Sequence, residues 1–382
     1  MTSATAARPE SLRVNNQVLL ALAVVAALAV ALCGFVTLAP NRLVSGKPVA
    51  LWQAAPSSGP VIIALVLALA GLALAPPIRA LHRFAAMLAA MLIVVALYAA
   101  GGAAQRLGAG MSALARVSLG AGFWVVIAAA ALIVVDGLQR AAAGPLERVA
   151  FALAIVAALA GLAASGALDA LSLVHEYNNR QGGFSAAVIR HIELVAGSVL
   201  PAIAVGVPLG LLSIRRERSR GPIFVTLNLL QTIPSIALFG LLIAPLAALG
   251  LGGVGPLPAL IALTLYALLP VARSTAAGLG GIDATIADAA RGMGMTGRQI
   301  LWRVEVPLAA PVLLAGLRIV VVQAIGLTVV AALIGAGGLG SFVFEGLGQD
   351  AADLVLLGAL PAILLALAAD FLLQLLAASV RR

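Results

Sequence analysis

The chain has 382 residues, of which 63% are hydrophobic and only 10% are charged. A soluble globular domain is about 25% charged, so this composition excludes an ordinary soluble protein. The formal net charge is +9, but no basic stretch is interleaved with aromatic residues, and arginines at the ends of membrane helices produce the same balance. The composition therefore predicts a protein that crosses a membrane several times and binds no nucleic acid.

Ten hydrophobic stretches follow one another along the chain, and a helix that spans a bilayer needs about 20 such residues. They predict an all-α, polytopic bundle of about ten transmembrane helices. The first is long enough to span, which favours a membrane helix over a cleaved signal peptide. The second and third are short, so the number of spans between residues 60 and 120 stays open. The stretches are 17–39, 60–75, 84–100, 119–135, 149–170, 190–214, 223–249, 256–276, 304–331 and 351–377.

The placement of arginine and lysine predicts the orientation of these spans. With the N-terminus in the cytoplasm, cytoplasmic segments hold 16 of the 23 Lys and Arg residues, outer segments hold 6, and Arg318 lies within a span. Cytoplasmic loops carry the excess of positive charge in membrane proteins. Both termini are therefore expected in the cytoplasm, together with the loop Arg215–Arg220.

A polar stretch from Val174 to Gly183 divides the chain into two domains. Residues 1–180 contain five spans of mostly Ala, Leu and Val, and they predict an accessory bundle. Residues 181–382 contain five further spans that are richer in polar residues, Gly and Pro. Among these, Pro201 and Pro208 are expected to interrupt the sixth span, because proline removes a helix hydrogen bond.

The seventh span contains polar residues around a proline. Polar side chains inside a bilayer are costly unless they face a cavity or a neighbouring helix. Their position beside a helix-breaking proline favours a translocation pathway, and hydrogen bonding between helices is the alternative. The candidate pathway residues are Asn228, Gln231, Thr232, Pro234 and Ser235.

A charged stretch, 281–307, separates the eighth and ninth spans. At helical spacing its apolar residues share one face with small alanines, and its charged residues take the other face. Gly292, Gly294 and Gly297 then permit a turn before a second helical segment near Ile300. An alanine-rich face suits a socket in a partner protein, and a helix lying on the bilayer surface is the alternative. The residues of the apolar face are Ile282, Ile286, Ala289, Ala290 and Met293.

This stretch resembles the signature loop of ABC importer permeases, which reads Glu-Ala-Ala, three residues, Gly, nine residues, Ile-x-Leu-Pro. Asp288-Ala289-Ala290, Gly294 and Val304-Glu305-Val306-Pro307 occupy these places, with Asp for Glu and Val for both Ile and Leu. The resemblance implies a cytoplasmic coupling helix at 282–303 that links ATP hydrolysis in a separate subunit to movement of the membrane domain. The coupling residues it implies are Ile286, Asp288, Ala289, Ala290, Arg291, Gly292, Gly294 and Pro307.

Further motifs are similar to those of permeases for glycine betaine, choline and carnitine. They are Gly206–Gly210, Gln231–Leu238, Leu268–Thr275 and Ala331–Gly340. The resemblance covers residues 190–377, and the whole chain is similar to an N-terminally extended variant of osmoprotectant permeases. It implies a type I ABC importer permease core in residues 181–382 and import of a compatible solute such as glycine betaine.

The same resemblance implies the partners and the location. The partners would be two ABC ATPase subunits, a second permease subunit that is identical or homologous, and a periplasmic substrate-binding protein. The location would be the bacterial inner membrane, with membrane lipid around the spans. The chain has only three Trp and three Tyr, so we do not expect it to form an aromatic cage for a quaternary ammonium group. High-affinity capture of the solute is therefore expected in the binding protein.

Several other features do not support a different chemistry. Gly335–Gly340 matches G-x-G-x-x-G, but a hydrophobic span precedes it, so a tight turn or close helix packing is expected there. The chain has no Walker A sequence. Its three histidines, including His191, sit at loop ends, and Cys33 is its only cysteine. We therefore expect no enzyme activity, no cofactor and no metal site.

Two other transport functions remain open. One is an ABC permease for another small solute, such as an amino acid. The other is a proton-coupled secondary transporter, in which Asp370 or Glu193 would carry protons within the membrane. Structural pairing with a basic residue is the alternative role for both acids.

Overall fold

The computed structural model describes residues 14–41, 44, 46–112 and 114–380. The chain forms two compact units, Met1–Asn178 and Asn179–Arg382. The boundary between them lies in the polar stretch 174–183.

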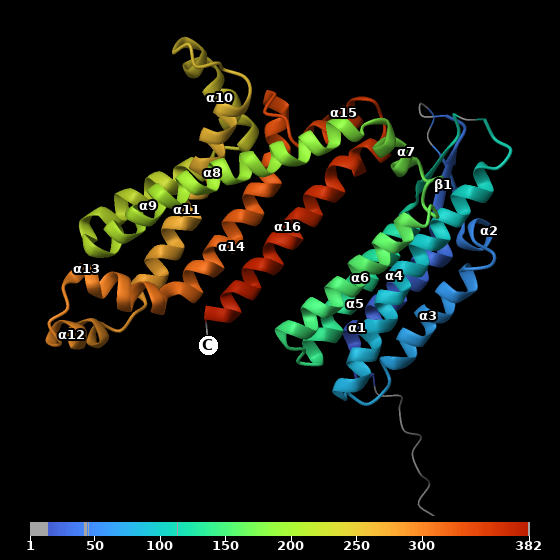
Figure 1. Cartoon of the computed structure of the whole chain (residues 1–382), viewed down its shortest axis with the longest axis horizontal. Coiled ribbons are helices and arrows are strands. Elements are labelled where there is room, and N and C mark those ends of the chain that lie inside the picture. Colours follow the sequence, from blue (N-terminus) through green and yellow to red (C-terminus); the bar gives the residue numbers. More distant parts are fainter. Residues whose placement is uncertain (1–13, 42–43, 45, 113, 381–382) are drawn as a thin grey trace, which may run out of the picture. The chain divides into compact units, whose positions relative to one another are not determined.

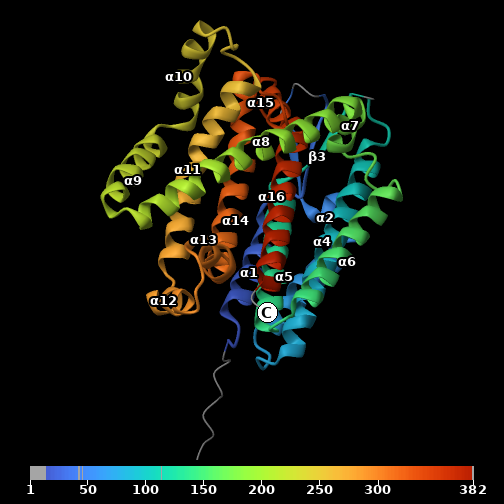
Figure 2. The same ribbon diagram turned by 60° about the vertical axis from the view of Figure 1, so that its left-hand side comes forward.

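The first unit consists mainly of helices that pack around α4 and α5 (Figures 1 and 2). Within this unit, α1 packs against α3 and α5, and α4 packs against α5. The helices are α1 (Gln17–Leu32), α2 (Leu51–Ala54), α3 (Gly59–Leu72), α4 (Arg79–Gly108), α5 (Ala121–Arg140), α6 (Pro145–Ala164) and α7 (Ser172–Asn179).

A small antiparallel sheet in this unit was not predicted. Its strands are β1 (Val36–Ala39), β2 (Lys47–Val49) and β3 (Arg116–Leu119), in the order β2-β1-β3. Val36 is opposite both Val49 and Leu119. The helical part of the first hydrophobic stretch therefore ends at Leu32, and the chain continues as the strand β1. α4 extends to Gly108, and β3 begins at Arg116.

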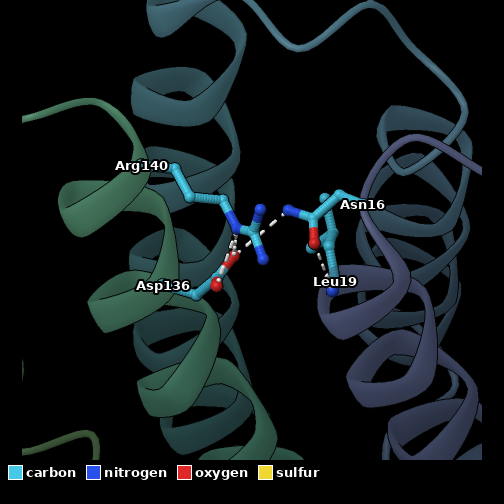
Figure 3. Close-up of polar contacts among 4 residues, drawn as sticks. All are labelled: Asn16, Leu19, Asp136 and Arg140. Carbon is cyan, nitrogen blue, oxygen red and sulfur yellow. Dashed lines mark hydrogen bonds and ion pairs between the residues drawn. The ribbon is translucent and has the colours of Figure 1, made fainter.

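A polar contact ties the start of α1 to the end of α5 (Figure 3). Asn16 caps α1, because its Oδ1 accepts a hydrogen bond of 3.0 Å from the backbone N–H of Leu19. Its Nδ2 donates to Asp136 Oδ2 at 3.1 Å, and Arg140 Nε donates to the same carboxylate at 2.9 Å. Asn16 is buried, so this contact satisfies a polar group that would otherwise be costly.

The second unit contains the long helices of the proline- and glycine-rich half. Here α11 packs against α8 and α14, and α14 packs against α16. Its elements are α8 (Gln181–Arg215), α9 (Glu217–Thr232), α10 (Ser235–Ala248), α11 (Pro256–Gly280), α12 (Ala284–Gly292), α13 (Gly297–Ile300), the π-helix η1 (Leu301–Glu305), α14 (Val306–Ala331), the 3-10 helix η2 (Ala332–Ile334), α15 (Gly340–Gly348) and α16 (Ala352–Val380).

The prediction of an all-α bundle with about ten spans is confirmed. Among the described residues, seven helices are long and apolar enough to cross a membrane, and the bent pair α9–α10 raises this number to eight. The shorter apolar helices α1 and α3 correspond to two further predicted stretches. The expected interruption of the sixth span is wrong, because α8 runs for 35 residues through Pro201 and Pro208.

At two positions of the second unit, helices pack so closely that only glycine fits. A Cβ on Gly210 of α8 would lie 2.6 Å from the carbonyl oxygen of Ala272 on α11. A Cβ on Gly316 of α14 would lie 2.1 Å from Cβ of Ser274 on α11. Both distances are far below van der Waals contact, so α11 can approach its neighbours only where they lack a side chain.

The segment Gly335–Gly340 forms a turn against the start of α8. Gly335, Gly337 and Gly338 have positive φ angles of 75°, 82° and 82°, a conformation that glycine adopts without strain. His191 lies within α8, faces this turn and is completely buried, so the prediction that it sits at the end of a loop is wrong. Its Nε2 lies 3.2 Å from the carbonyl oxygen of Ile325.

Candidate functional site

The charged stretch between α11 and α14 folds into a compact segment, which we call the coupling segment (residues 283–305). It begins at Asp283, whose side chain accepts a hydrogen bond of 2.9 Å from the backbone N–H of Thr285 and so caps α12. This hydrogen bond holds the pKa of the Asp283 carboxyl below its usual value. The cap therefore stabilises α12 at neutral pH, and its contribution is lost as the pH falls through the lowered pKa.

Gly294 ends α12 in a left-handed conformation. Its φ is +83°, its N–H donates to Arg291 O at 2.9 Å, and the next N–H, of Met295, donates to Ala290 O at 3.1 Å. These two bonds make a Schellman motif, which uses a residue with positive φ to reverse the chain after a helix. The backbone of this turn therefore favours the glycine that the signature pattern predicts at this position.

The segment then returns to the membrane-spanning part. Thr296 and Gln299 form a capping box, in which the Thr296 N–H donates to Gln299 Oε1 at 2.8 Å and the Thr296 side chain caps the Gln299 N–H. α13 passes directly into the π-helix Leu301–Glu305 and then into α14, with Pro307 in its first turn. A displacement of the coupling segment would thus act on α14 without an intervening loop.

The residues of the predicted apolar face are partly buried and partly exposed in the structure. Ala290 is only 2% exposed and packs inside the chain, whereas Ile286 is 40% and Met293 is 75% exposed. Asp288 and Arg291 form an exposed ion pair one turn apart. Of the expected coupling residues, those that lie exposed are Ile286, Asp288, Ala289, Arg291, Gly292, Gly294 and Pro307.

The expected pathway residues gather at a break between α9 and α10. The two helices meet at an angle of 98° across Ile233 and Pro234. Pro234 has no N–H and cannot continue the hydrogen-bonding pattern of α9. The polar residues of the seventh span therefore lie on both sides of a sharp bend.

Side chains of α9 and α11 hold the break against α11. Gln231 Nε2 donates to the carbonyl oxygen of Tyr266 at 2.8 Å, and the Tyr266 hydroxyl donates to the carbonyl oxygen of Ile233. Arg273 donates to Asn228 Oδ1 at 2.7 Å. Asn228 and Gln231 therefore take part in the hydrogen bonding between helices that was the alternative to a pathway role.

The remaining candidates near the break are more accessible. Thr232 and Pro234 are exposed and Ser235 is half-buried. The Thr232 hydroxyl donates to the Leu229 carbonyl within its own helix. Tyr266 and Arg273 were not assigned to the site from the sequence, although both are polar residues in the adjacent span.

Comparison with known proteins identifies both units. Residues 202–382 match the family "Binding-protein-dependent transport system inner membrane component", and residues 14–174 match "ABC transporter permease YehY, N-terminal domain". The osmoprotectant import permease protein OsmW of Salmonella typhimurium is 42% identical over 204 residues, which cover 53% of this chain and 94% of that protein. The chain belongs to the osmoprotectant permease family of ABC importers.

Two other relatives have more specific names. The carnitine transport permease protein OpuCB of Listeria monocytogenes is 41% identical to the permease over 48% of this chain and 82% of that protein. The glycine betaine/carnitine/choline transport system permease protein OpuCB of Bacillus subtilis is 37% identical over 48% of this chain and 81% of that protein. These relatives match only about half of the permease, in agreement with a separate family for residues 14–174.

Membership in this family confirms the resemblance seen in the sequence. The chain is a multi-span permease subunit of a bacterial inner-membrane ABC importer, and it is not itself an enzyme. Permeases of this class act with an ATPase and a substrate-binding protein.

Both acids that were considered as proton carriers are paired. In the permease core, Asp370 on α16 accepts hydrogen bonds from Arg318 on α14, with Arg318 Nη2 at 2.9 Å from Oδ2. Glu193 lies 3.0 Å from Arg190 on the same helix. Nowhere in the described parts of the permease do three His, Cys, Asp or Glu side chains come together as a metal site.

The hydroxyl of Tyr266 gives a direct test of the α9–α10 break. Replacing Tyr266 with Phe removes the donor to the Ile233 carbonyl, which is expected to lower the free energy of unfolding by about 1–3 kcal/mol. The midpoint of thermal unfolding of the purified permease would measure this loss. Tyr98→Phe is the matched control, because Tyr98 is 56% exposed on α4. Equal midpoints for the two variants would contradict the role of the hydroxyl at the break.

Proposed function

We propose that this permease carries a compatible solute such as glycine betaine across the inner membrane. The observation that carries the proposal is the 42% identity to an osmoprotectant permease across 94% of that protein. The relatives named for carnitine and for glycine betaine, carnitine and choline support the same class of small, quaternary ammonium solutes.

The coupling segment is the proposed contact with the ATPase. Two ATPase subunits would dock on residues 282–303 of two permease subunits, which are identical or homologous. Three features support this role: the exposed Ile286 and Met293, the left-handed turn at Gly294, and the direct passage of the segment into α14. Closure of the ATPase pair would move α14 and switch the pathway between inward-facing and outward-facing states.

The pathway is proposed to pass the break between α9 and α10. Thr232, Pro234 and Ser235 are the accessible members of the set, and a bent helix leaves backbone polar groups free to meet a solute. Asn228 and Gln231 would act by holding the break against α11. A periplasmic binding protein would deliver the solute at the outer end.

The proposed orientation has both termini in the cytoplasm, and the coupling segment with them. The bias of arginines between the two sides supports it. Within this arrangement residues 1–180 form an accessory bundle, and residues 181–382 form the permease core.

Uptake of labelled glycine betaine into proteoliposomes tests the function. The purified complex with its ATPase and binding protein should take up betaine only when ATP is present on the ATPase side. ATP hydrolysis that is coupled to another solute, such as an amino acid, would contradict the proposed substrate. Uptake by the permease alone under a proton gradient would contradict the whole mechanism.

A further inference from the structure

The turn between α8 and α9 carries a dense group of positive charge, which we call the arginine cluster (Arg215, Arg216, Arg218 and Arg220). All four side chains are exposed. Elsewhere in the described chain, Arg83, Arg140 and Arg291 are paired with Glu147, Asp136 and Asp288.

No carboxylate in the described parts of the chain pairs with the arginine cluster. Glu217, within the turn, is exposed and forms no ion pair there. The four guanidinium groups are therefore open to an anion from outside the chain, and their mutual repulsion favours one.

The turn is tight, and it holds the cluster at a defined place. Arg216 is the C-cap of α8 and the N-cap of α9, so this single residue separates the two helices. α8 and α9 contact each other, and they meet at this turn (Figures 1 and 2). The cluster also lies at the end of the permease core that carries the coupling segment, because a Cβ on Gly280 of α11 would lie 3.3 Å from Ile214 of α8.

The surface beside the cluster is apolar. Leu212, one turn before Arg216, and Val225, just over one turn after Arg220, are both exposed, as is Leu229 further along α9. Such side chains face lipid tails in a helix that spans a membrane. Because an α-helix rises 1.5 Å per residue, Arg216 lies about 6 Å from Leu212 along α8, and Arg220 lies about 8 Å from Val225 along α9. At such distances from an apolar surface, long basic side chains can reach the lipid head groups.

We propose that the arginine cluster binds the anionic head groups of phospholipids in the leaflet on the side of the coupling segment. The chemistry that fits is the phosphodiester of a lipid with net negative charge, such as phosphatidylglycerol. The location in the cytoplasmic leaflet rests on the proposed orientation of the permease. Bound lipid would fix the α8–α9 turn beside the end of α11, from which the coupling segment begins.

Native mass spectrometry of the purified complex, titrated with phosphatidylglycerol or phosphatidylcholine, tests the proposal. The unsubstituted complex should bind phosphatidylglycerol more tightly than phosphatidylcholine. The double variant Arg216→Gln/Arg218→Gln should bind phosphatidylglycerol about fivefold more weakly for each arginine removed. Its affinity for phosphatidylcholine should stay the same.

A variant that keeps the charge separates lipid from protein partners. Arg216→Lys/Arg218→Lys should keep the preference for phosphatidylglycerol, because a phosphate accepts a lysine as a point charge, whereas a bidentate contact with a protein carboxylate needs arginine. Loss of the ATPase subunit from the glutamine variant, with its lipid affinity unchanged, would overturn the proposal. So would equal affinities of the glutamine variant and the unsubstituted complex for phosphatidylglycerol.

The unsubstituted complex provides a second measurement that needs no variant. Purified in about 1 M salt, where the Debye length falls to about 3 Å, it should retain less phosphatidylglycerol than in 0.1 M salt, with phosphatidylcholine unchanged. Equal retention at both salt concentrations would overturn the proposal. The betaine uptake assay is independent of these results, so failure of the proposed function and failure of lipid binding are distinguishable.

Discussion

Valine in place of Gly294 is expected to reduce ATP-driven solute uptake about tenfold, whereas asparagine at the same position should leave most of it. Gly294 has a φ of +83°, and this left-handed conformation costs an L-residue about 1–2 kcal/mol. The cost is highest for a β-branched side chain, and asparagine tolerates the conformation best after glycine. A cost of about 1.4 kcal/mol lowers the equilibrium constant between the native turn and its alternatives tenfold.

We expect a large loss of uptake because few side-chain contacts stabilise the coupling segment besides the turn at Gly294. Ala290 and Ile300 are buried, but Ile286 and Met293 are exposed, so few contacts within the chain oppose a change in the turn. A Cβ at Gly294 meets no atom within 4 Å, which means that the loss would come from the backbone and not from a clash.

A second glycine of the same segment serves as the control. Gly297 also has open space around it, but it lies in the first turn of α13 and its φ is not positive, so Gly297→Val is expected to transport normally. Uptake and ATP hydrolysis should be measured together in proteoliposomes, at equal amounts of inserted protein. If asparagine at position 294 is as inactive as valine, the left-handed backbone is not the reason for the glycine, and direct contact with the ATPase would explain it instead.

Some features of the fold could be predicted from the sequence because their physical cause is local. The place of Gly294 follows from a local rule, since a helix that turns back on itself commonly needs a left-handed residue at its end. The spans follow from the length of apolar runs, which the bilayer thickness dictates. In both cases the physical requirement lies within one short segment of the chain.

Other features depend on partners that are distant in the sequence. β1 has only four residues and pairs with residues that are distant in the sequence, 9 positions away in the pair Leu38–Lys47 and 83 positions away in the pair Val36–Leu119. No local pattern therefore indicated it. The burial of His191 depends on the turn at Gly338, which belongs to a different part of the chain. Pro201 and Pro208 were expected to break α8, but a helix within a packed bundle can keep its course through a proline.

The pair Arg318–Asp370 should show the largest stability effect in the permease core. Both Nε and Nη2 of Arg318 donate to the carboxylate, and Gln374 Nε2 donates to the same group at 2.8 Å. α14 and α16 are both apolar spans, so either charge alone would lack a partner in a medium that solvates it poorly. Removing one partner of such a pair typically costs about 3–5 kcal/mol.

The two single variants and the double variant therefore form a double-mutant cycle, which measures the interaction between Arg318 and Asp370. Arg318→Leu and Asp370→Leu are each expected to lower the free energy of unfolding by about 3 kcal/mol, near the low end of that range because the two side chains are 43% and 24% exposed. The double variant Arg318→Leu/Asp370→Leu should recover most of this loss, because no unpaired charge remains. Thermal unfolding midpoints and the yield of monodisperse protein would measure all three.

Uptake by the double variant decides what the pair does beyond stability. If Asp370 only holds α16 against α14, a stable double variant should transport solute with ATP as the unsubstituted permease does. If Asp370 carries protons, the double variant should be stable but inactive, and uptake by the unsubstituted permease should follow the proton gradient. Because Arg318 donates to both oxygens of the carboxylate and Gln374 donates to one of them, these contacts account for Asp370 as a group that holds α16 against α14, and we expect the first result.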